Sequence, residues 1–175
     1  MQREKAAWLV LALIAMGAGL LLGFTNAVTA DVIAQRALDA AEQARREVFP
    51  AAQAFVELPP CDAVQDSFCA MQGEQCIGYV CTLSVQGYGG PIEVVVGLDA
   101  AGALTGISVG GSRFAETAGL GANTRSPAFT GQFAGLVPPL TVKKDVDAVT
   151  GATISSTAVV NAVNAAAAYV AGLDQ

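Results

Sequence analysis

A short run rich in hydroxyl side chains, residues 147–156, is the part of this chain best suited to chemistry. It reads Asp-Ala-Val-Thr-Gly-Ala-Thr-Ile-Ser-Ser, and an alanine-rich stretch of helical composition follows it. The start of a helix leaves backbone N–H groups free and carries partial positive charge, which suits a phosphate group. Gly151 allows backbone geometries that a side chain would block. The run therefore indicates a phosphate-binding helix start or, equally simply, an ordinary N-cap, since Ser and Thr are common caps.

The composition excludes several other kinds of chemistry. Histidine is absent from the 175 residues, which removes His-based acid–base catalysis, His-containing triads and His-ligated metal sites. The glycine-rich loop 87–91 matches neither a Walker nor a G-x-G-x-x-G signature, and no NAD fingerprint is present. The net charge is −6, with basic pairs only at 45–46 and 143–144, so nucleic acid is a poor partner. We expect no catalytic residue and no metal site.

The hydroxyl-rich run also carries a family resemblance. Its pattern D-x-x-T-G-A-T-x-S resembles the flavinylation motif of the FMN-binding domains in the G subunit of the Rnf complex and the C subunit of the sodium-pumping NADH:quinone reductase. The resemblance implies that FMN is joined covalently, through a phosphoester, to Thr153, and that a separate Mg-dependent flavin transferase attaches it from FAD. It also implies a group of recognition and positioning residues: Asp147, Thr150, Gly151, Ala152 and Ser155.

A second stretch, residues 110–121, reads alone as a long loop, and long loops in compact domains are often functional. It resembles the E-T-P-G-L-G loop that packs beside the flavin in the same family, with Ala118 in the place of the usual Pro. The resemblance implies that five residues contact the cofactor: Glu116, Thr117, Gly119, Leu120 and Gly121. Thr117 could hydrogen-bond the ring edge and Leu120 could pack on its face.

An unbroken apolar run, residues 6–24, has the length needed to cross a bilayer core. Arg3 and Lys5 precede it and acidic residues dominate the segment just after it, so the positive-inside tendency predicts a cytoplasmic N-terminus. The alternative is a cleaved signal peptide, because residues 28–30 have the small-x-small form of a cleavage site. The run is longer than a typical signal core, so we expect an uncleaved, single-pass anchor in the cell (inner) membrane, with the rest of the chain outside the cytoplasm.

The remainder predicts an α+β fold. Residues 26–48 have helical composition and end before Pro50, so the membrane helix should continue outward as a stalk. Alternating apolar residues predict an antiparallel meander of strands at 77–85, 92–98 and 103–109. Further on we expect a short helix from Ser126-Pro127 to about 133, a short strand at 140–143 and a core-facing helix at 158–171. The expected parts are an anchor (1–25), a stalk (26–50) and a small FMN-binding domain (51–175).

Four cysteines lie within about twenty residues, after the predicted membrane segment. An even count outside the cytoplasm suggests two disulfides. Cys76 and Cys81 fall in one predicted strand, too far apart to bond each other. A hairpin turning at 72–73 would set Cys69 opposite Cys76, so we expect the pairs Cys69–Cys76 and Cys61–Cys81. These bonds would be structural.

The resemblance implies a membrane-anchored electron carrier, the G subunit of an Rnf-type ferredoxin:NAD oxidoreductase coupled to ion translocation. A carrier of this kind has no complete activity alone, and its partners are the other membrane and peripheral subunits and the flavin transferase. The alternatives are the C subunit of the sodium-translocating NADH:quinone reductase, a stand-alone extracellular flavoprotein, and an assembly module without flavin, in which Thr153 is only a helix cap.

Overall fold

The computed structural model describes the backbone of residues 2–61 and 64–173. Residues 1, 62–63 and 174–175, which belong to the predicted anchor and FMN-binding domain, lie outside the described part. By internal contacts the chain forms two compact units, residues 1–41 and 42–175. The first unit lies within one long helix, α1 (Gln2–Val48), which contains both the apolar run 6–24 and the predicted helical segment 26–48. Its apolar side chains are exposed, among them Trp8, Leu21 and Phe24. The segment Ala7–Val48 is long and apolar enough to cross a membrane.

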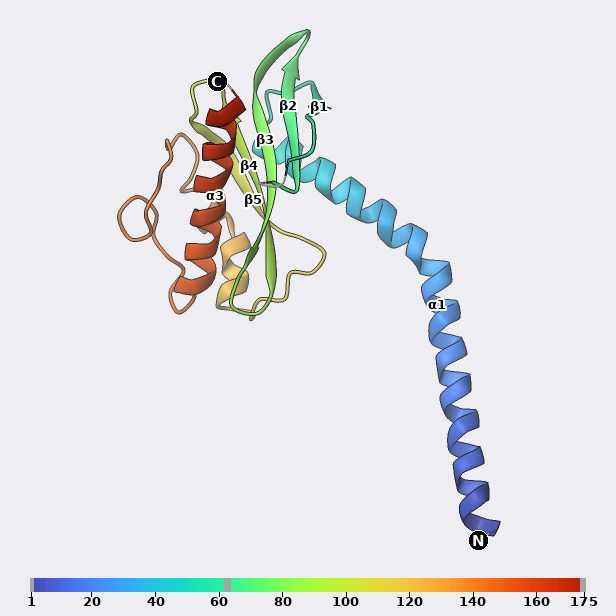
Figure 1. The fold of residues 1–175 in the computed structure, drawn as a ribbon. Helices are drawn as coiled ribbons and strands as arrows, with labels where there is room; N and C mark the ends of the chain where they lie inside the picture. The colour runs from blue at the N-terminus through green and yellow to red at the C-terminus, as the bar shows by residue number, and fades with distance from the viewer. Residues whose placement is uncertain (1, 62–63, 174–175) are drawn as a thin grey trace. The chain divides into compact units, whose positions relative to one another are not determined.

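The second unit is built on one antiparallel sheet of five strands, drawn from teal (β1) through green to yellow in Figure 1. Its strands are β1 (Ala54–Glu57), β2 (Asp66–Gln72), β3 (Gln75–Gln86), β4 (Pro91–Asp99) and β5 (Leu104–Gly110). Each strand pairs with the next along the chain, as expected for a meander of hairpins. The predicted α+β class is confirmed, with β1 and β2 added to the three predicted strands.

One face of the sheet is covered by the last helix, α3 (Thr153–Leu173), as Figure 1 shows. Its buried side chains recur at helical spacing and include Val159, Val163, Ala166 and Val170. They pack in one core with apolar side chains of β3 and β4, among them Leu83, Ile92, Val94 and Val96. Helix α3 is long and apolar enough to cross a membrane. However, half of its apolar stretch is buried inside the unit, as in the core helix of a globular domain.

A smaller core covers the opposite face of the sheet, where the end of α1 meets glycines. Val48 and Phe49 are buried there with Val80 and Val95. A Cβ at Gly97 would lie 2.8 Å from the Val48 carbonyl oxygen, so only glycine permits this approach. The Thr105 hydroxyl donates to the same oxygen at 2.6 Å. The last turns of α1 are therefore part of the second unit.

Several local predictions were wrong. Helix α3 begins at Thr153, five residues before the predicted start, because hydrogen bonds between Ser156, Ala152 and Val149 cap it earlier. The predicted strand at 140–143 is only an isolated bridge between Val142 and Val146. The Asp145 carboxylate accepts the Thr141 N–H at 2.8 Å, and Lys143 has a φ of 70°, which makes the segment a turn. Helix α2 (Pro127–Thr130) is shorter than predicted, and a 3-10 helix, η1 (Gly121–Arg125), precedes it.

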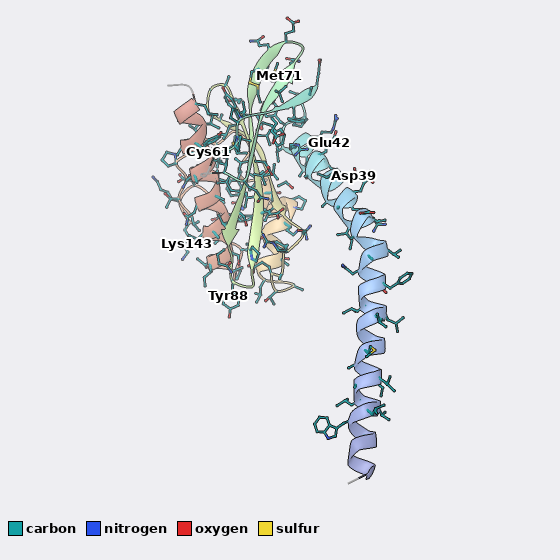
Figure 2. The ribbon with its side chains drawn as sticks, turned by 45° about the vertical axis from the view of Figure 1, so that its right-hand side comes forward. Asp39, Glu42, Cys61, Met71, Tyr88 and Lys143 are labelled. Carbon is teal, nitrogen blue, oxygen red and sulfur yellow. A yellow bond between two sulfur atoms is a disulfide. The ribbon has the colours of Figure 1, made fainter. Side chains whose placement is uncertain are left out.

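The cysteines form one disulfide, between Cys69 and Cys76, whose Cα atoms are 5.9 Å apart. The two residues are not directly opposite, because a register shift at Ala70/Met71 sets Cys76 against Met71. Met71 lies near the tip of this hairpin in Figure 2. The predicted Cys61–Cys81 bond is wrong, since both thiols are free, Cys61 exposed and Cys81 buried. Burial in the α3 core raises the pKa of the Cys81 thiol to about 12.

Candidate functional site

The candidate site is centred on Thr153, the first residue of α3, whose side chain is exposed. The first backbone hydrogen bond into the helix runs from the Ser156 N–H to the Ala152 carbonyl at 3.0 Å. The N–H groups of residues 153–155 therefore precede the ladder, and within residues 2–61 and 64–173 they have no acceptor. Three free donors and the positive end of the helix dipole lie beside one exposed hydroxyl.

Local hydrogen bonds fix where the helix starts. The buried Ser156 hydroxyl accepts the Val149 N–H at 3.0 Å and donates to the Ala152 carbonyl at 2.9 Å. The Ala152 N–H donates to the Val149 carbonyl at 2.9 Å, and Gly151 between them has a φ of 77°. Such a φ strains any residue with a side chain, so Gly151 is required here for the turn. Together these bonds hold Thr153 at the surface.

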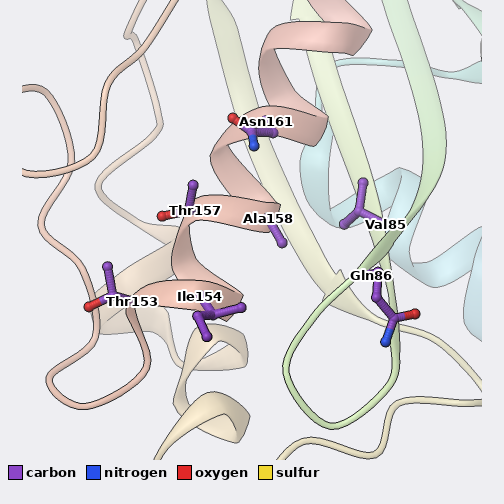
Figure 3. A pocket seen from close by; sticks show the side chains of 7 residues that line it. All are labelled: Val85, Gln86, Thr153, Ile154, Thr157, Ala158 and Asn161. Atoms are coloured by element: carbon purple, nitrogen blue, oxygen red, sulfur yellow. The ribbon is translucent and has the colours of Figure 1, made fainter.

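A groove of about 480 Å³ runs beside Thr153, between the first turns of α3 and the end of β3. Figure 3 shows Ile154 and Ala158 on the side of α3 that faces Val85. These three side chains give the groove an apolar wall, while Gln86 and Asn161 supply amide groups. The full lining is Val85, Gln86, Thr153, Ile154, Thr157, Ala158 and Asn161. The groove can therefore hold a flat apolar group whose edge needs hydrogen bonds.

The loop of residues 110–121 packs against the start of α3 through Glu116 and Leu120. One carboxylate oxygen of Glu116 accepts the Ser155 hydroxyl at 2.9 Å, and the other accepts the Gly89 N–H at 3.1 Å. A Cβ built on Gly151 would lie 2.9 Å from the Leu120 side chain, so these two residues are in close contact. The loop and the hydroxyl-rich run, although distant in sequence, are neighbours.

The structure separates the residues predicted to bind FMN into groups. Thr153 alone lines the groove. Glu116, Gly121 and Ser155 meet one another behind the first helical turn, and Ala152 is buried in the cap. The remaining side chains or Cα atoms are exposed at the surface: Asp147, Thr150, Gly151, Thr117, Gly119 and Leu120.

Sequence reasoning missed the rest of the groove lining, on both α3 and β3. Thr157 and Asn161 follow Thr153 at intervals of four, so helical spacing could have identified them. Val85 and Gln86 come from the end of β3, and the sequence holds no signal that this strand end faces α3. Tyr88 follows at the exposed β3–β4 turn, as Figure 2 shows. Across the described ranges, no three Cys, Asp or Glu residues gather in a way that could hold a metal ion.

Comparison with known proteins identifies the second unit. Residues 87–168 match the model of the FMN-binding domain family. The chain is 32% identical over 155 residues to the G subunit of the proton-translocating ferredoxin:NAD(+) oxidoreductase complex of Clostridium ljungdahlii, a match covering 85% of this chain and 81% of that protein. It is also 32% identical over 181 residues to the Na(+)-translocating counterpart of Acetobacterium woodii, covering 89% and 86%. The crystal structure of the C subunit of the Na(+)-translocating NADH-quinone reductase from Parabacteroides distasonis aligns with a TM-score of 0.52 and 26% identity, covering 63% of each chain.

Residues 87–168, which contain β4, β5 and the start of α3, thus match an FMN-binding domain. The chain as a whole belongs to the family of G subunits of the ion-translocating ferredoxin:NAD(+) oxidoreductase complexes, the Rnf complexes. The resemblance found in residues 147–155 is confirmed at the level of the family.

The residues present fit an FMN group. Its phosphate matches the three free N–H donors of residues 153–155 and the positive end of the helix dipole. Its ring system matches the apolar wall of Val85, Ile154 and Ala158, with the amides of Gln86 and Asn161 in the same groove. Thr153 lies where these two regions meet, because it belongs both to the first turn and to the groove lining.

Proposed function

We propose that this protein is a membrane-anchored electron carrier with FMN bound covalently to Thr153, acting as the G subunit of an Rnf-type ion-translocating ferredoxin:NAD(+) oxidoreductase. One observation carries the proposal. Of the hydroxyls at the start of α3, those of Ser155 and Ser156 are fully buried and already hydrogen-bonded, whereas that of Thr153 is exposed and lines the groove.

The attachment step is a phosphoryl transfer onto the chain. The Oγ1 atom of Thr153 forms a bond to the FMN-side phosphorus of FAD, the bond between that phosphorus and the bridging oxygen breaks, and AMP leaves with that oxygen. We assign the base that takes the hydroxyl proton to the separate flavin transferase: this chain has no histidine, and the Glu116 carboxylate already accepts hydrogen bonds from Ser155 and Gly89. The exposed side chains of Asp147 and Thr150 are available for recognition by the transferase.

Bound FMN supplies reversible one- and two-electron transfer. The residues of the chain would hold it: the N–H groups of residues 153–155 would bind the phosphate, Val85 and Ile154 would pack on the ring, and Gln86 and Asn161 would supply hydrogen bonds to its edge. Leu120, which is exposed and in contact with Gly151 just before α3, and the exposed Thr117 of the same loop could cover the remaining ring surface. A phosphoester at Thr153 prevents loss of the flavin by dissociation, which matters for a domain outside the cytoplasm.

The remaining parts of the chain have supporting roles. We propose that residues 1–25 form the membrane anchor, residues 26–50 the stalk and residues 51–175 the FMN domain, with the N-terminus in the cytoplasm. Residues 6–24 contain no charged side chain, so this anchor provides no ionisable group for an ion path. Ion translocation and nicotinamide chemistry therefore belong to partner subunits.

The decisive experiment is intact-mass measurement of the protein co-expressed with a flavin transferase. We expect the wild type to gain the mass of one FMN less one water and to fluoresce in a denaturing gel. Thr153→Ala should lose both signals and keep its fold, because the Thr153 side chain is exposed. The matched control is Thr157→Ala, one turn further along the groove, which should stay fluorescent. A dark wild-type band would contradict covalent flavin and leave the assembly-module alternative.

The C subunit of the sodium-translocating quinone reductase is the second candidate, supported by the structural likeness at 26% identity. The Rnf assignment is favoured because two Rnf relatives match at 32% identity over more than four fifths of their length. Copurification separates the two: ferredoxin-oxidising partners would support the Rnf complex, and quinone-reducing partners would support the quinone reductase.

A further inference from the structure

Glu116 joins three segments that are far apart in the sequence. Its carboxylate accepts one hydrogen bond from the β3–β4 turn, at Gly89, and one from the first turn of α3, at Ser155. These partners lie 27 and 39 residues away along the chain. Both are donors, and no cation pairs with Glu116 among the residues that the structure describes. An ionised carboxylate, which only accepts, suits two facing donors.

Two glycines make room for this carboxylate. A Cβ on Gly87 would collide with one carboxylate oxygen of Glu116, and a Cβ on Gly121 would collide with the other. The Gly121 Cβ would also lie 3.0 Å from the Ser155 hydroxyl. A side chain at either position would therefore force the Glu116 carboxylate out of the place where it makes its two hydrogen bonds.

The position of Glu116 leaves the phosphate donors free. Its carboxylate binds the Ser155 side chain and not the N–H groups at the start of α3. Ser155 is two residues after Thr153, which is about 200° around the helix, so Glu116 holds the side of the turn that faces away from Thr153. Glu116 thus holds the first turn of α3 on its Ser155 side and leaves the Thr153 side accessible. The Gly89 bond connects the same carboxylate to the turn that follows Gln86, a wall of the groove.

We propose that Glu116 is a positioning residue for flavin attachment, an inference that rests on the proposed function. It sets the start of α3 against the β3–β4 turn, and so presents the Thr153 hydroxyl and the groove in the arrangement that the transferase requires. In this role Glu116 acts through Ser155 and Gly89 and does not itself contact the flavin. Its shape and its hydrogen bonds matter, and its negative charge does not.

The test measures kcat and KM for loading the full-length chain with a flavin transferase and FAD, followed by fluorescence anisotropy of the attached flavin. Glu116→Ala removes both hydrogen bonds, and we expect a loss in kcat of about 10- to 100-fold, as for misplaced reacting groups, with faster flavin motion in the loaded protein. Glu116→Gln keeps the shape: its amide oxygen can accept the Gly89 N–H, and its NH₂ can donate to the Ser155 hydroxyl. We expect Gln to restore loading to within a few-fold of the wild type. Glu74→Gln, on the exposed β2–β3 turn, is the matched control and should load normally.

The outcomes separate the two proposals. Loading of Glu116→Ala at the wild-type rate, or a Glu116→Gln variant as slow as Glu116→Ala, would overturn the positioning role while covalent flavin stands. A wild type that takes up no flavin would overturn the proposed function and this inference with it. If circular dichroism shows Glu116→Ala unfolded, Ser155→Ala carries the test. We expect it to load more slowly than the wild type, and unchanged loading would overturn the proposal.

Discussion

The side-chain amide of Gln132 makes two hydrogen bonds to the backbone of Asp147. Its oxygen accepts the Asp147 N–H at 2.8 Å, and its nitrogen donates to the Asp147 carbonyl at 3.3 Å. This pair holds the beginning of the hydroxyl-rich run by its main chain, so the Asp147 side chain remains exposed. The first residue of the run is therefore fixed in place and presented outward.

We expect Gln132→Ala to release this anchor. The variant should lose about 1–2 kcal/mol of unfolding free energy, because the half-buried Gln132 gives up two hydrogen bonds. It should also raise the KM of the transferase for the chain, since Asp147 is no longer fixed. Urea unfolding and loading kinetics check the two effects. Gln75→Ala, at an exposed site on β3, should change neither, and an unaltered KM in Gln132→Ala would show that the anchor is not needed for recognition.

A methyl group at Gly121 should be poorly tolerated. In Gly121→Ala the new Cβ would collide with the Glu116 carboxylate, and we expect a loss of about 1–3 kcal/mol in unfolding free energy, typical of overpacking. Flavin loading should fall as well. Gly172→Ala provides the comparison, because its Cβ would meet nothing within 4 Å and alanine favours helix. Equal stability of the two variants in urea would argue against a tightly enclosed carboxylate.

The Ser156 hydroxyl should account for much of the stability of the α3 start. Ser156→Ala leaves the Val149 N–H without its acceptor, and we expect a loss of about 1–3 kcal/mol. Hydrogen exchange should then speed up at residues 149–156 more than in the middle of α3. Ser84→Ala, an exposed substitution on β3, serves as the control. If amide hydrogens exchanged at the same rate along all of α3 in Ser156→Ala, the Ser156 hydroxyl would not be what stabilises the start of the helix.

The Cys81 thiol should make stability depend on pH in the alkaline range. Its pKa is about 12 in the folded chain, against 9.0 without burial. Above pH 9.0 the unfolded chain releases this proton while the folded chain keeps it, so the unfolding free energy should fall as pH rises from 9.0 toward 12. Urea titrations between pH 7 and 10 would measure the slope. Cys81→Ala should show a smaller decline, and the same slope in both chains would contradict this assignment.

The disulfide closes a short loop, with a sequence separation of 7 between Cys69 and Cys76. A loop of this size stabilises a fold by about 2–3 kcal/mol through restriction of the unfolded chain. Reduction, or the double change Cys69→Ser with Cys76→Ser, should lower the urea midpoint by a corresponding amount. The groove that we propose for the flavin lies at the other end of β3, at Val85 and Gln86, so loading of the folded variant should not change. Cys61→Ser, at an exposed free thiol, is the control.

Local sequence patterns predict which helices and strands this fold contains better than they predict the residues at which each begins and ends. Alternating apolar residues such as Ile92, Val94 and Val96 predicted β4, because their burial follows directly from period-two geometry. The start of α3 was placed five residues too late, because it depends on the Ser156 hydroxyl reaching back to Val149. The pair Cys61–Cys81 follows only from the even number of cysteines, as the two left over after Cys69 and Cys76. The sequence does not reveal that Cys81 lies in the core under α3.

The site was predictable to the same limited degree. Thr153 could be singled out from its motif, whereas the opposite wall of the groove could not. Val85 and Gln86 belong to a strand end whose meeting with α3 is a property of the whole fold. The Glu116–Ser155 bond likewise spans 39 residues, and no local rule pairs them.

The order of the strands has a consequence for how the protein is made. Because each strand pairs with the next, the sheet can form from contacts between residues close in sequence, which favours early and rapid folding. Helix α3 is the last element described, and its Ser155 and Tyr169 bond to residues 39 and 102 positions earlier. We expect Thr153 to take its final geometry only after α3 has been synthesised and has packed on the sheet that formed before it. A transferase that recognises this geometry would then act on chains in which α3 has packed onto the sheet and pass over chains in which it has not.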